Sequence, residues 1–425
     1  MAGASTLAER LIARAAGRDV VSAGEIVTCK VDLAMMHDSG GPRRVKPMLD
    51  RLGAKPWDPS RVAVVADHYV PATDAESAAI VALTREWARA HDISHFYDSE
   101  GICHVVLPER GLIRPGLFIV GGDSHSPTGG AFGAFMVGIG ATEMLGVLVK
   151  GEIWIKVPRT LLLSWHGRLA AGVTAKDMML HLCGTLGQTA VNYRAVEFAG
   201  EAVAALPMAE RMTLCNMTTE LGAKAGLIAP DATTLRYLRD VGAPVDEAEI
   251  AAWRTDPAAD YEMQLSYDAG ALSPQVAAPH SPENAGPVGE HAGVAIGRAY
   301  IGACTGAKLA DLRMAAEILK GRRIAAGTRL VVAPASTRIS AQAEAEGTLG
   351  ALVEAGAVLL PTGCGACAGY GAGLLDEGEV CISSTARNFR GRMGAASAQI
   401  YLGSPYTVAA AAVAGHIVDP RELLS

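Results

Sequence analysis

Residues 116–125 read GLFIVGGDSH, an apolar run that ends in an aspartate, a serine and a histidine. A short apolar run bounded by glycines is typical of a buried strand. The same pattern recurs in RVAVVADH (61–68), and helix-like stretches such as KLADLRMAAEILK (308–320) separate runs of this kind. This alternation predicts an α/β fold whose sheets are mostly parallel.

Polar clusters follow five of the predicted strands, at the point where each apolar run ends. Because ligands bind at the carboxyl edge of an open parallel sheet, these clusters predict one shared site. They are Asp67-His68 after 61–66, Asp123-Ser124-His125 after 116–122, Cys304 after 299–303, Cys364 and Cys367 after 357–361, and Arg387-Asn388 after 379–383.

Composition argues against several classes of protein. The net charge is −7 and no basic run occurs, so we do not expect nucleic acid to be the main partner. Half of the residues are hydrophobic and the mean hydropathy is +0.23. No apolar run, however, reaches the roughly 18–20 uncharged residues that a membrane span needs. We therefore expect no membrane partner.

Cysteine usage and the N-terminal stretch bear on the compartment. Eight cysteines without regular spacing do not form a disulfide framework, which favours a reducing, cytoplasmic setting. Arg10, Arg14 and Arg18 lie at helical spacing in a stretch without a continuous apolar segment. This pattern predicts an amphipathic surface helix rather than an export signal.

The residues alone leave the role of the cysteines open. Cys364 and Cys367 form a Cys-x-x-Cys motif, and Cys304 lies in an equivalent strand–cysteine–helix setting. A thioredoxin-type dithiol leaves Cys304 unexplained, and structural zinc would need a second pair of ligands. Three cysteines in glycine-rich loops suit an iron–sulfur cluster with one open iron position, and inert buried thiols are the alternative.

Six longer stretches carry a resemblance to a known family. They are GGDSHSPTGGAFGAFMVGIGATEM (121–144), GEIWIKVP (151–158), GVTAKD (172–177), EFAGEAV (197–203), RMTLCNMTTELGAKAGLIAPDATT (211–234) and RNFRGR (387–392). In this order they resemble the aconitase superfamily, specifically the large subunits of the isopropylmalate dehydratase and homoaconitase branch. The resemblance implies three aconitase-like α/β subdomains over 1–158, 159–292 and 293–425, with an irregular connection over 240–292.

The resemblance also implies a role for individual residues. It implies a [4Fe-4S] cluster held by the three cysteines, acid–histidine pairs that move protons, and polar and guanidinium groups that hold the substrate. The cluster ligands would be Cys304, Cys364 and Cys367; the pairs Asp67 with His68, His104 with Asp123, and His125 with Glu220; and the substrate-binding residues Ser124, Asn216, Arg387 and Arg392. His37 also lies in a family-like segment, MMHDSGGP, and its role remains open.

Four positions depart from the family pattern. Ala303 and Gly306 stand where relatives usually carry a serine and an asparagine, Ala366 stands where proline or methionine is common, and Ala386 stands where they carry an asparagine. These changes remove hydrogen-bond partners rather than ligands. We therefore expect the cluster to be retained, but with altered stability or substrate preference. Restoring the common residues (Ala303→Ser, Gly306→Asn, Ala386→Asn) is then expected to slow cluster loss in air and to shift the preference among malate analogues.

The resemblance implies a hydro-lyase that acts on a malate-type 2-hydroxy acid, with 3-isopropylmalate dehydratase as the first expectation. Hydratases of homoaconitate, citraconate, maleate or 2,3-dimethylmalate are the nearest alternatives. A non-catalytic or RNA-binding aconitase-like protein is the alternative from another class. The sequence shows no match to the family's swivelling domain, so we expect a separate small subunit as partner.

Overall fold

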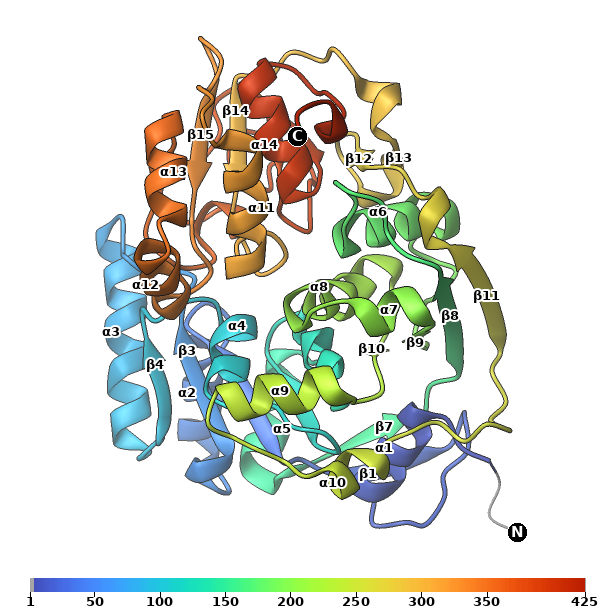
Figure 1. Ribbon diagram of the computed structural model, residues 1–425. Helices are drawn as coiled ribbons and strands as arrows, with labels where there is room; N and C mark the ends of the chain where they lie inside the picture. Colours follow the sequence, from blue (N-terminus) through green and yellow to red (C-terminus); the bar gives the residue numbers. More distant parts are fainter. Residues whose placement is uncertain (1–3, 425) are drawn as a thin grey trace.

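The computed structural model describes residues 4–424, and these form an α/β fold with mostly parallel sheets, which confirms the predicted fold class (Figure 1). In Figure 1 the chain begins at the lower right, most of its blue and cyan part lies at the lower left, and the last part, in orange and red, lies at the top. The middle of the chain, in green and yellow, lies on the right.

The first large sheet has five parallel strands in the order β4-β3-β2-β5-β6. All five residues of its strand β3 are buried, as expected for a strand covered on both faces. The apolar runs at 61–67 and 116–122 form β3 and β5, as predicted. The strands are β2 (Leu33–His37), β3 (Val62–Ala66), β4 (His95–Asp98), β5 (Phe118–Gly121) and β6 (Phe135–Gly138).

Helices α2 (Pro42–Leu52), α3 (Ala75–Ala90) and α5 (Ala141–Lys150) belong to the same part of the chain; α3 contacts β3, and α5 contacts β2. Helix α3 begins where the Asp74 carboxylate accepts a hydrogen bond from the Ser77 N–H at 2.7 Å. Such a cap contributes about 1 kcal/mol to the stability of a helix. The short helix α4 (Cys103–Glu109) follows β4.

The second sheet has four parallel strands in the order β10-β9-β8-β11. Helices α6 (Ala175–Leu186) and α8 (Met208–Met217) pack against each other beside it. The strands are β8 (Thr160–His166), β9 (Ala195–Ala199), β10 (Ala225–Leu227) and β11 (Met263–Asp268).

The third sheet has seven strands in the order β13-β12-β18-β17-β14-β15-β16. Its pairings are parallel except for β12 with β13 and β12 with β18. The runs predicted at 299–303, 357–361 and 379–383 form β14, β16 and β17. The strands are β12 (Gln275–Ala277), β13 (Ala285–Pro287), β14 (Arg298–Ile301), β15 (Arg329–Val332), β16 (Val358–Leu359), β17 (Val380–Ser383) and β18 (Gln399–Leu402), and the helices are α11 (Leu309–Leu319), α12 (Thr337–Ala345), α13 (Thr348–Ala355) and α14 (Pro405–Ala414).

The segment 240–292, expected as an irregular connection, contains regular elements as well as loops. It contains the short helix α10 (Glu247–Ala251), strand β11 of the second sheet, and strands β12 and β13 of the third sheet. The boundaries of the three proposed subdomains stay a proposal. The remaining α-helices and strands are α1 (Leu7–Ala15), α7 (Glu201–Ala205), α9 (Ala232–Asp240) and an antiparallel pair of β1 (Ile26–Lys30) with β7 (Glu152–Lys156).

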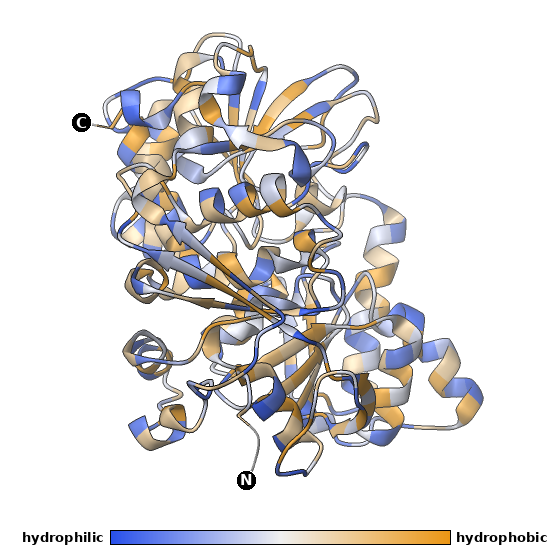
Figure 2. Cartoon of the chain, turned by 90° about the vertical axis from the view of Figure 1, so that its right-hand side faces the viewer, coloured by the Kyte–Doolittle hydropathy of each residue, from blue (hydrophilic) through white to orange (hydrophobic). Residues whose placement is uncertain are grey.

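The predicted N-terminal helix is present as α1. Thr6 and Glu9 cap its first turn, and Leu7, Leu11 and Ile12 are fully buried while Arg14 is exposed. Within residues 4–424 no helix combines the length and the apolar character that crossing a bilayer requires. Figure 2 shows apolar residues concentrated on the central strands, whereas the helices carry both apolar and polar residues.

Candidate active site

The carboxyl ends of β2, β3 and β5 bring one set of polar side chains together, and loops of the third sheet contribute the cysteines. One hydrogen bond joins the two parts directly, because the Cys364 N–H donates to the Asp67 carbonyl oxygen at 2.7 Å. Another runs from the Arg387 Nη1 to the Ser124 Oγ at 2.9 Å. The polar clusters that the sequence places after separate strands are therefore connected through hydrogen bonds.

Asp67 and His68 form the first acid–imidazole pair, directly after β3. The His68 Nδ1 lies 2.6 Å from the Asp67 Oδ1, and the other oxygen of Asp67 accepts the Cys103 N–H at 2.8 Å. Burial lowers the pKa of His68, but the carboxylates of Asp67 and Asp38 outweigh burial and raise that pKa to about 9. His68 therefore carries a proton at neutral pH.

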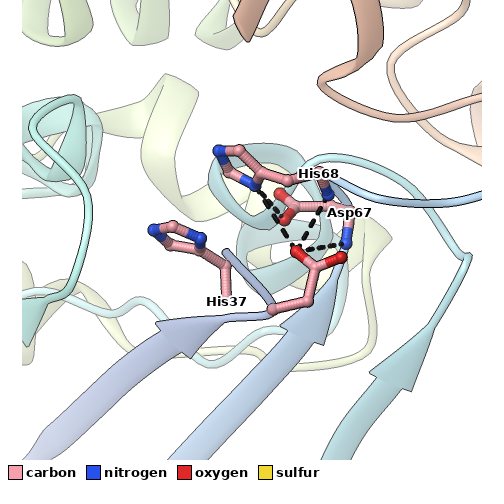
Figure 3. A group of neighbouring side chains, drawn as sticks. His37, Asp67 and His68 are labelled. Carbon is pink, nitrogen blue, oxygen red and sulfur yellow. Dashed lines mark hydrogen bonds and ion pairs between the residues drawn. The ribbon is translucent and has the colours of Figure 1, made fainter. Parts of the chain in front are cut away.

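Two further residues lie beside this pair. The sequence patterns did not indicate Asp38, and they left the role of His37 open. Asp38 accepts the N–H groups of Asp67, His68 and Tyr69 at 3.4, 3.0 and 2.8 Å, so it fixes the loop that presents His68. The ring of His37 stacks on that of His68, with ring centroids 4.1 Å apart. Figure 3 shows His37 beside the Asp67–His68 pair. In LAMMHD (33–38) an apolar run again ends in polar residues, as in the other predicted strands. Asp38 could therefore have been found by examining the residues after every apolar run.

The hydrogen bonds of His37 identify its neutral form. Its Nδ1 accepts the Gly40 N–H at 3.3 Å, and its Nε2 lies 3.0 Å from the Gly122 carbonyl oxygen. Burial and the neighbouring His68 lower the pKa of His37 to about 4. The two stacked rings therefore differ in charge, with His37 neutral and His68 protonated.

Asp123 lies at the centre of the second group. Its Oδ1 accepts from the His104 Nε2 at 2.7 Å and from the His125 N–H at 2.8 Å. Burial raises the pKa of Asp123, but both histidines outweigh burial and hold that pKa well below its ordinary value. The His104 Nδ1 is buried and has no hydrogen-bond partner within residues 4–424, which leaves one ring nitrogen for a ligand.

His125 and Glu220 continue this group towards the arginine loop. The His125 Nε2 lies 3.2 Å from the Glu220 Oε1, which also accepts from the Arg387 Nε at 2.8 Å. Burial and Arg387 lower the pKa of His125, whereas Asp123 and Glu220 raise it, and the pKa is raised overall. Arg387 is thus held by Glu220 and Ser124.

Both clusters include enough imidazole and carboxylate groups to be considered as metal sites. The ligand atoms of His37, Asp38, Asp67 and His68 lie within 4.8 Å of one another, as do those of His104, Asp123 and His125. In each cluster, however, the carboxylates already accept backbone N–H or imidazole groups. These clusters are better suited to moving protons than to binding a cation.

The three cysteine ligands of the predicted cluster lie in contact with other site residues. The thiols of Cys364 and Cys367 are hydrogen-bonded to each other, and Arg392 contacts the Cys367 thiol. The hydrogen bond from Cys364 is the largest influence on Cys367; burial opposes it, Arg392 reinforces it, and the pKa of Cys367 falls to about 5. The Asn216 Nδ2 donates to the Cys304 Sγ at 3.1 Å.

Unpartnered polar atoms around the cysteines test whether an iron–sulfur cluster fits. The Asn216 Oδ1, the Arg392 Nε and the Tyr300 hydroxyl are buried and have no hydrogen-bond partner in the described part of the chain. Buried polar groups normally have partners, and sulfides accept hydrogen bonds from such donors. The Arg392 Nε and the Tyr300 hydroxyl supply donors of this kind, so the residues fit the cluster. The other five cysteines are all buried, as predicted for small apolar side chains: Cys29, Cys103, Cys183, Cys215 and Cys381.

The structure corrects one expectation about the departures from the family pattern. A β-carbon at Gly306 would lie 2.1 Å from the Ser384 Oγ and 2.6 Å from the Ser384 carbonyl oxygen. An asparagine at this position therefore does not fit unless the backbone moves, which argues against the expectation that Gly306→Asn would help to slow cluster loss. Ala303 and Ala386 are buried, and Ala303 adopts φ +68°.

The fold and the site define a class. Parallel sheets present acid–histidine pairs beside a three-cysteine constellation, and the family model for aconitase (aconitate hydratase) matches residues 11–415. The chain belongs to the aconitase family. Its fold is similar to the crystal structure of Thermococcus kodakaraensis aconitase X, with a TM-score of 0.52 and 12% identity over 85% of this chain and 84% of that one.

Curated relatives narrow the branch within this family. The chain is 44% identical to the 3-isopropylmalate dehydratase large subunit 1 of Methanopyrus kandleri, over 99% of both chains. It is 43% identical to the 3-isopropylmalate dehydratase large subunit of Nitratidesulfovibrio vulgaris, over 99% of this chain and 100% of that one. It is also 44% identical to a Methanosarcina mazei protein named "Probable methanogen homoaconitase large subunit", over 92% of this chain and 99% of that one.

Proposed function

We propose that the chain is the large subunit of a [4Fe-4S]-dependent hydro-lyase that isomerises a malate-type 2-hydroxy acid, with 3-isopropylmalate as the first substrate to test. One observation carries the proposal: the Asp67-His68 pair is hydrogen-bonded through its backbone to the loop of Cys364, at 2.7 Å. A proton donor thus lies next to a cysteine constellation. Full-length relatives that are named dehydratase large subunits support the same branch.

Cys304, Cys364 and Cys367 would hold the cluster, with Asn216 and Arg392 beside their sulfur atoms. When bound, the cluster supplies an open iron position that acts as a Lewis acid towards the hydroxyl and carboxylate of the substrate. All further steps fall to side chains of the two subunits.

The proton chemistry follows from the charge states of the site. His68 is protonated at neutral pH and is oriented by Asp67, so it is suited to protonate the leaving hydroxyl. Asp123 orients His104, whose Nδ1 has no partner within residues 4–424, and this pair is suited to hold the substrate hydroxyl or the released water. Arg387 and Arg392 are suited to hold carboxylates, because a guanidinium group can bind both oxygens at once.

The base that takes the C3 proton belongs, by resemblance to the family, to a swivelling domain. We propose that a separate small subunit supplies it here, because the chain aligns over nearly its whole length with relatives that are named large subunits. The isolated chain would then lack a base, and a missing acid or base typically reduces the rate 10²–10⁴-fold. We propose a cytoplasmic location, in keeping with eight cysteines that are all free thiols.

The second candidate is a homoaconitase large subunit. The relative from Methanosarcina mazei supports it, because its identity to the chain is as high as that of the first relative. A non-catalytic role is disfavoured by the buried acid–histidine pairs, since such groups are costly to bury and are typical of active sites.

The test is turnover by anaerobically prepared chain with a panel of 2-hydroxy acids, with and without a small subunit of a dehydratase of this family. We expect turnover of 3-isopropylmalate with the small subunit and at least a hundredfold less without it. Turnover of homocitrate, citramalate and malate, measured under the same conditions, identifies the preferred substrate. Equal turnover by the isolated chain would refute the two-subunit proposal, and no turnover of any acid by the pair would refute the proposed reaction.

A further inference from the structure

Ser384 lies between the loop of Cys304 and the loop of Arg387, and it is completely buried. Its Oγ accepts the Gly302 N–H at 3.0 Å and lies 3.2 and 3.3 Å from the carbonyl oxygens of Gly302 and Gly306. One hydroxyl group therefore contacts the backbone on both sides of Cys304. Within residues 4–424, no other side chain is hydrogen-bonded to the backbone of both glycines.

Further hydrogen bonds hold the backbone of Ser384, one of them from the Cys304 loop itself. Its N–H donates to the Tyr300 carbonyl oxygen at 3.0 Å, and its own carbonyl oxygen accepts from the Thr305 Oγ1 and the Lys176 Nζ, both at 3.0 Å. Lys176 is itself buried and also donates to the Thr385 carbonyl oxygen. Ser384 cannot shift without breaking these bonds, so it is a rigid support for the Cys304 loop.

Gly306 completes this arrangement. Because a β-carbon at position 306 would lie 2.1 Å from the Ser384 Oγ, the hydroxyl of Ser384 fills the space that a side chain at 306 would need. The loop is thus held by a hydroxyl from the neighbouring strand end instead of by a side chain of its own. This accounts for the glycine at position 306.

We propose that Ser384 is a positioning residue that holds the thiol of Cys304 in the orientation needed to bind iron. The effect of Ser384 on cluster binding rests on the proposed function, whereas the effect of Ser384 on the Cys304 loop does not. Loss of the hydroxyl frees the Gly302 N–H and removes the one O–H proton that the Gly302 and Gly306 carbonyl oxygens share, so the loop opens and Cys304 becomes accessible.

The test compares Ser384→Ala with Ser383→Ala in the full chain. Ser383 is equally buried, but its hydroxyl bonds to Thr385 and makes no hydrogen bond to the Cys304 loop. The first measurement is the rate of N-ethylmaleimide labelling of each cysteine in metal-free, reduced protein, resolved by peptide mass spectrometry. We expect labelling of Cys304 to rise about five- to tenfold in Ser384→Ala only, the change that loss of one buried hydrogen bond produces. Labelling of Cys381 should not change.

The second measurement is the rate of iron loss in air from the reconstituted protein, which should rise in Ser384→Ala and not in Ser383→Ala. In Ser384→Thr, which keeps the hydroxyl, the rates of Cys304 labelling and of iron loss should equal those of the parent. If Ser384→Ala does not fold, Thr305→Val removes the other side-chain bond across the same junction and should give the same selective rise at Cys304 to a smaller extent.

Equal labelling of Cys304 in the parent, Ser384→Ala and Ser383→Ala would overturn the proposal, as would an equal rise in both alanine variants. If the parent binds no iron, the proposed function fails, but the labelling experiment still tests the role of Ser384. The two failures are therefore distinguishable.

Discussion

Replacing Asp67 with Asn should lower the pKa of His68 from about 9 to below about 7. Asp67 is the nearest carboxylate, with its Oδ1 2.6 Å from the His68 Nδ1, whereas Asp38 lies 3.7 Å away. The pKa of His68 is about 9 against an ordinary value of 6.5, a difference of about 2.5. At 1.36 kcal/mol for each pKa unit, this corresponds to about 3 kcal/mol in favour of the protonated ring.

The sign of the effect on stability follows from this direction. The pKa of His68 is raised in the folded state, so the protonated ring stabilises the fold fully below about pH 6.5. That contribution is lost as the pH rises through about 9. The Asp67→Asn variant should therefore be less stable than the parent at pH 6, and the gap should narrow towards pH 10.

The assay is NMR of protein labelled with ¹⁵N in its histidines, titrated between pH 5 and pH 10, with His68→Gln to assign the signal. Asp240→Asn, on an exposed position of α9, is the control for loss of one carboxylate and should leave the pKa of His68 unchanged. A pKa of His68 that stays above about 8.5 in Asp67→Asn would refute the charge assignment of the site.

Two further predictions concern the loops of the third sheet. Gly306→Asn should destabilise the protein by about 1–3 kcal/mol, the usual cost of overpacking a filled core, and a melting temperature equal to that of the parent would contradict the close approach of Ser384. Arg387→Lys keeps the charge but cannot reproduce both bonds, to Glu220 and to Ser124, so KM should rise on the order of tenfold with a smaller change in kcat. An unchanged KM would show that Arg387 does not hold the substrate.

Much of the fold and the site could be predicted from local sequence patterns. Apolar runs that end in Asp67-His68 and Asp123-Ser124-His125 form buried strands, because both the apolar run and the polar residues after it are properties of adjacent residues. The parallel arrangement then brings their ends to one edge, which is why residues 56 positions apart along the chain, such as Asp67 and Asp123, belong to one site.

The remaining features depend on contacts between distant segments. The pairing of β12 and β13 with the third sheet is set by long-range backbone hydrogen bonds that no local pattern encodes. The exclusion of a side chain at Gly306 depends on Ser384, 78 residues later in the chain. The charge states of His37 and His68 likewise depend on burial and on neighbours from two strands. Because both residues are histidines, the sequence alone does not distinguish their charges.

The central claim is that Cys304, Cys364 and Cys367 hold a catalytic iron–sulfur cluster. Its most direct test is the iron and acid-labile sulfide content of anaerobically reconstituted parent, Cys364→Ser and Cys381→Ser, with the visible absorbance recorded on the same samples. Cys381 is fully buried on β17 and serves as the matched control for loss of a thiol. The account predicts about four iron and four sulfide atoms per chain and a brown colour in the parent and in Cys381→Ser. In Cys364→Ser the iron, the sulfide and the colour should all be lost. Reproducible binding of zinc, no metal in the parent, or full iron content in Cys364→Ser would contradict it.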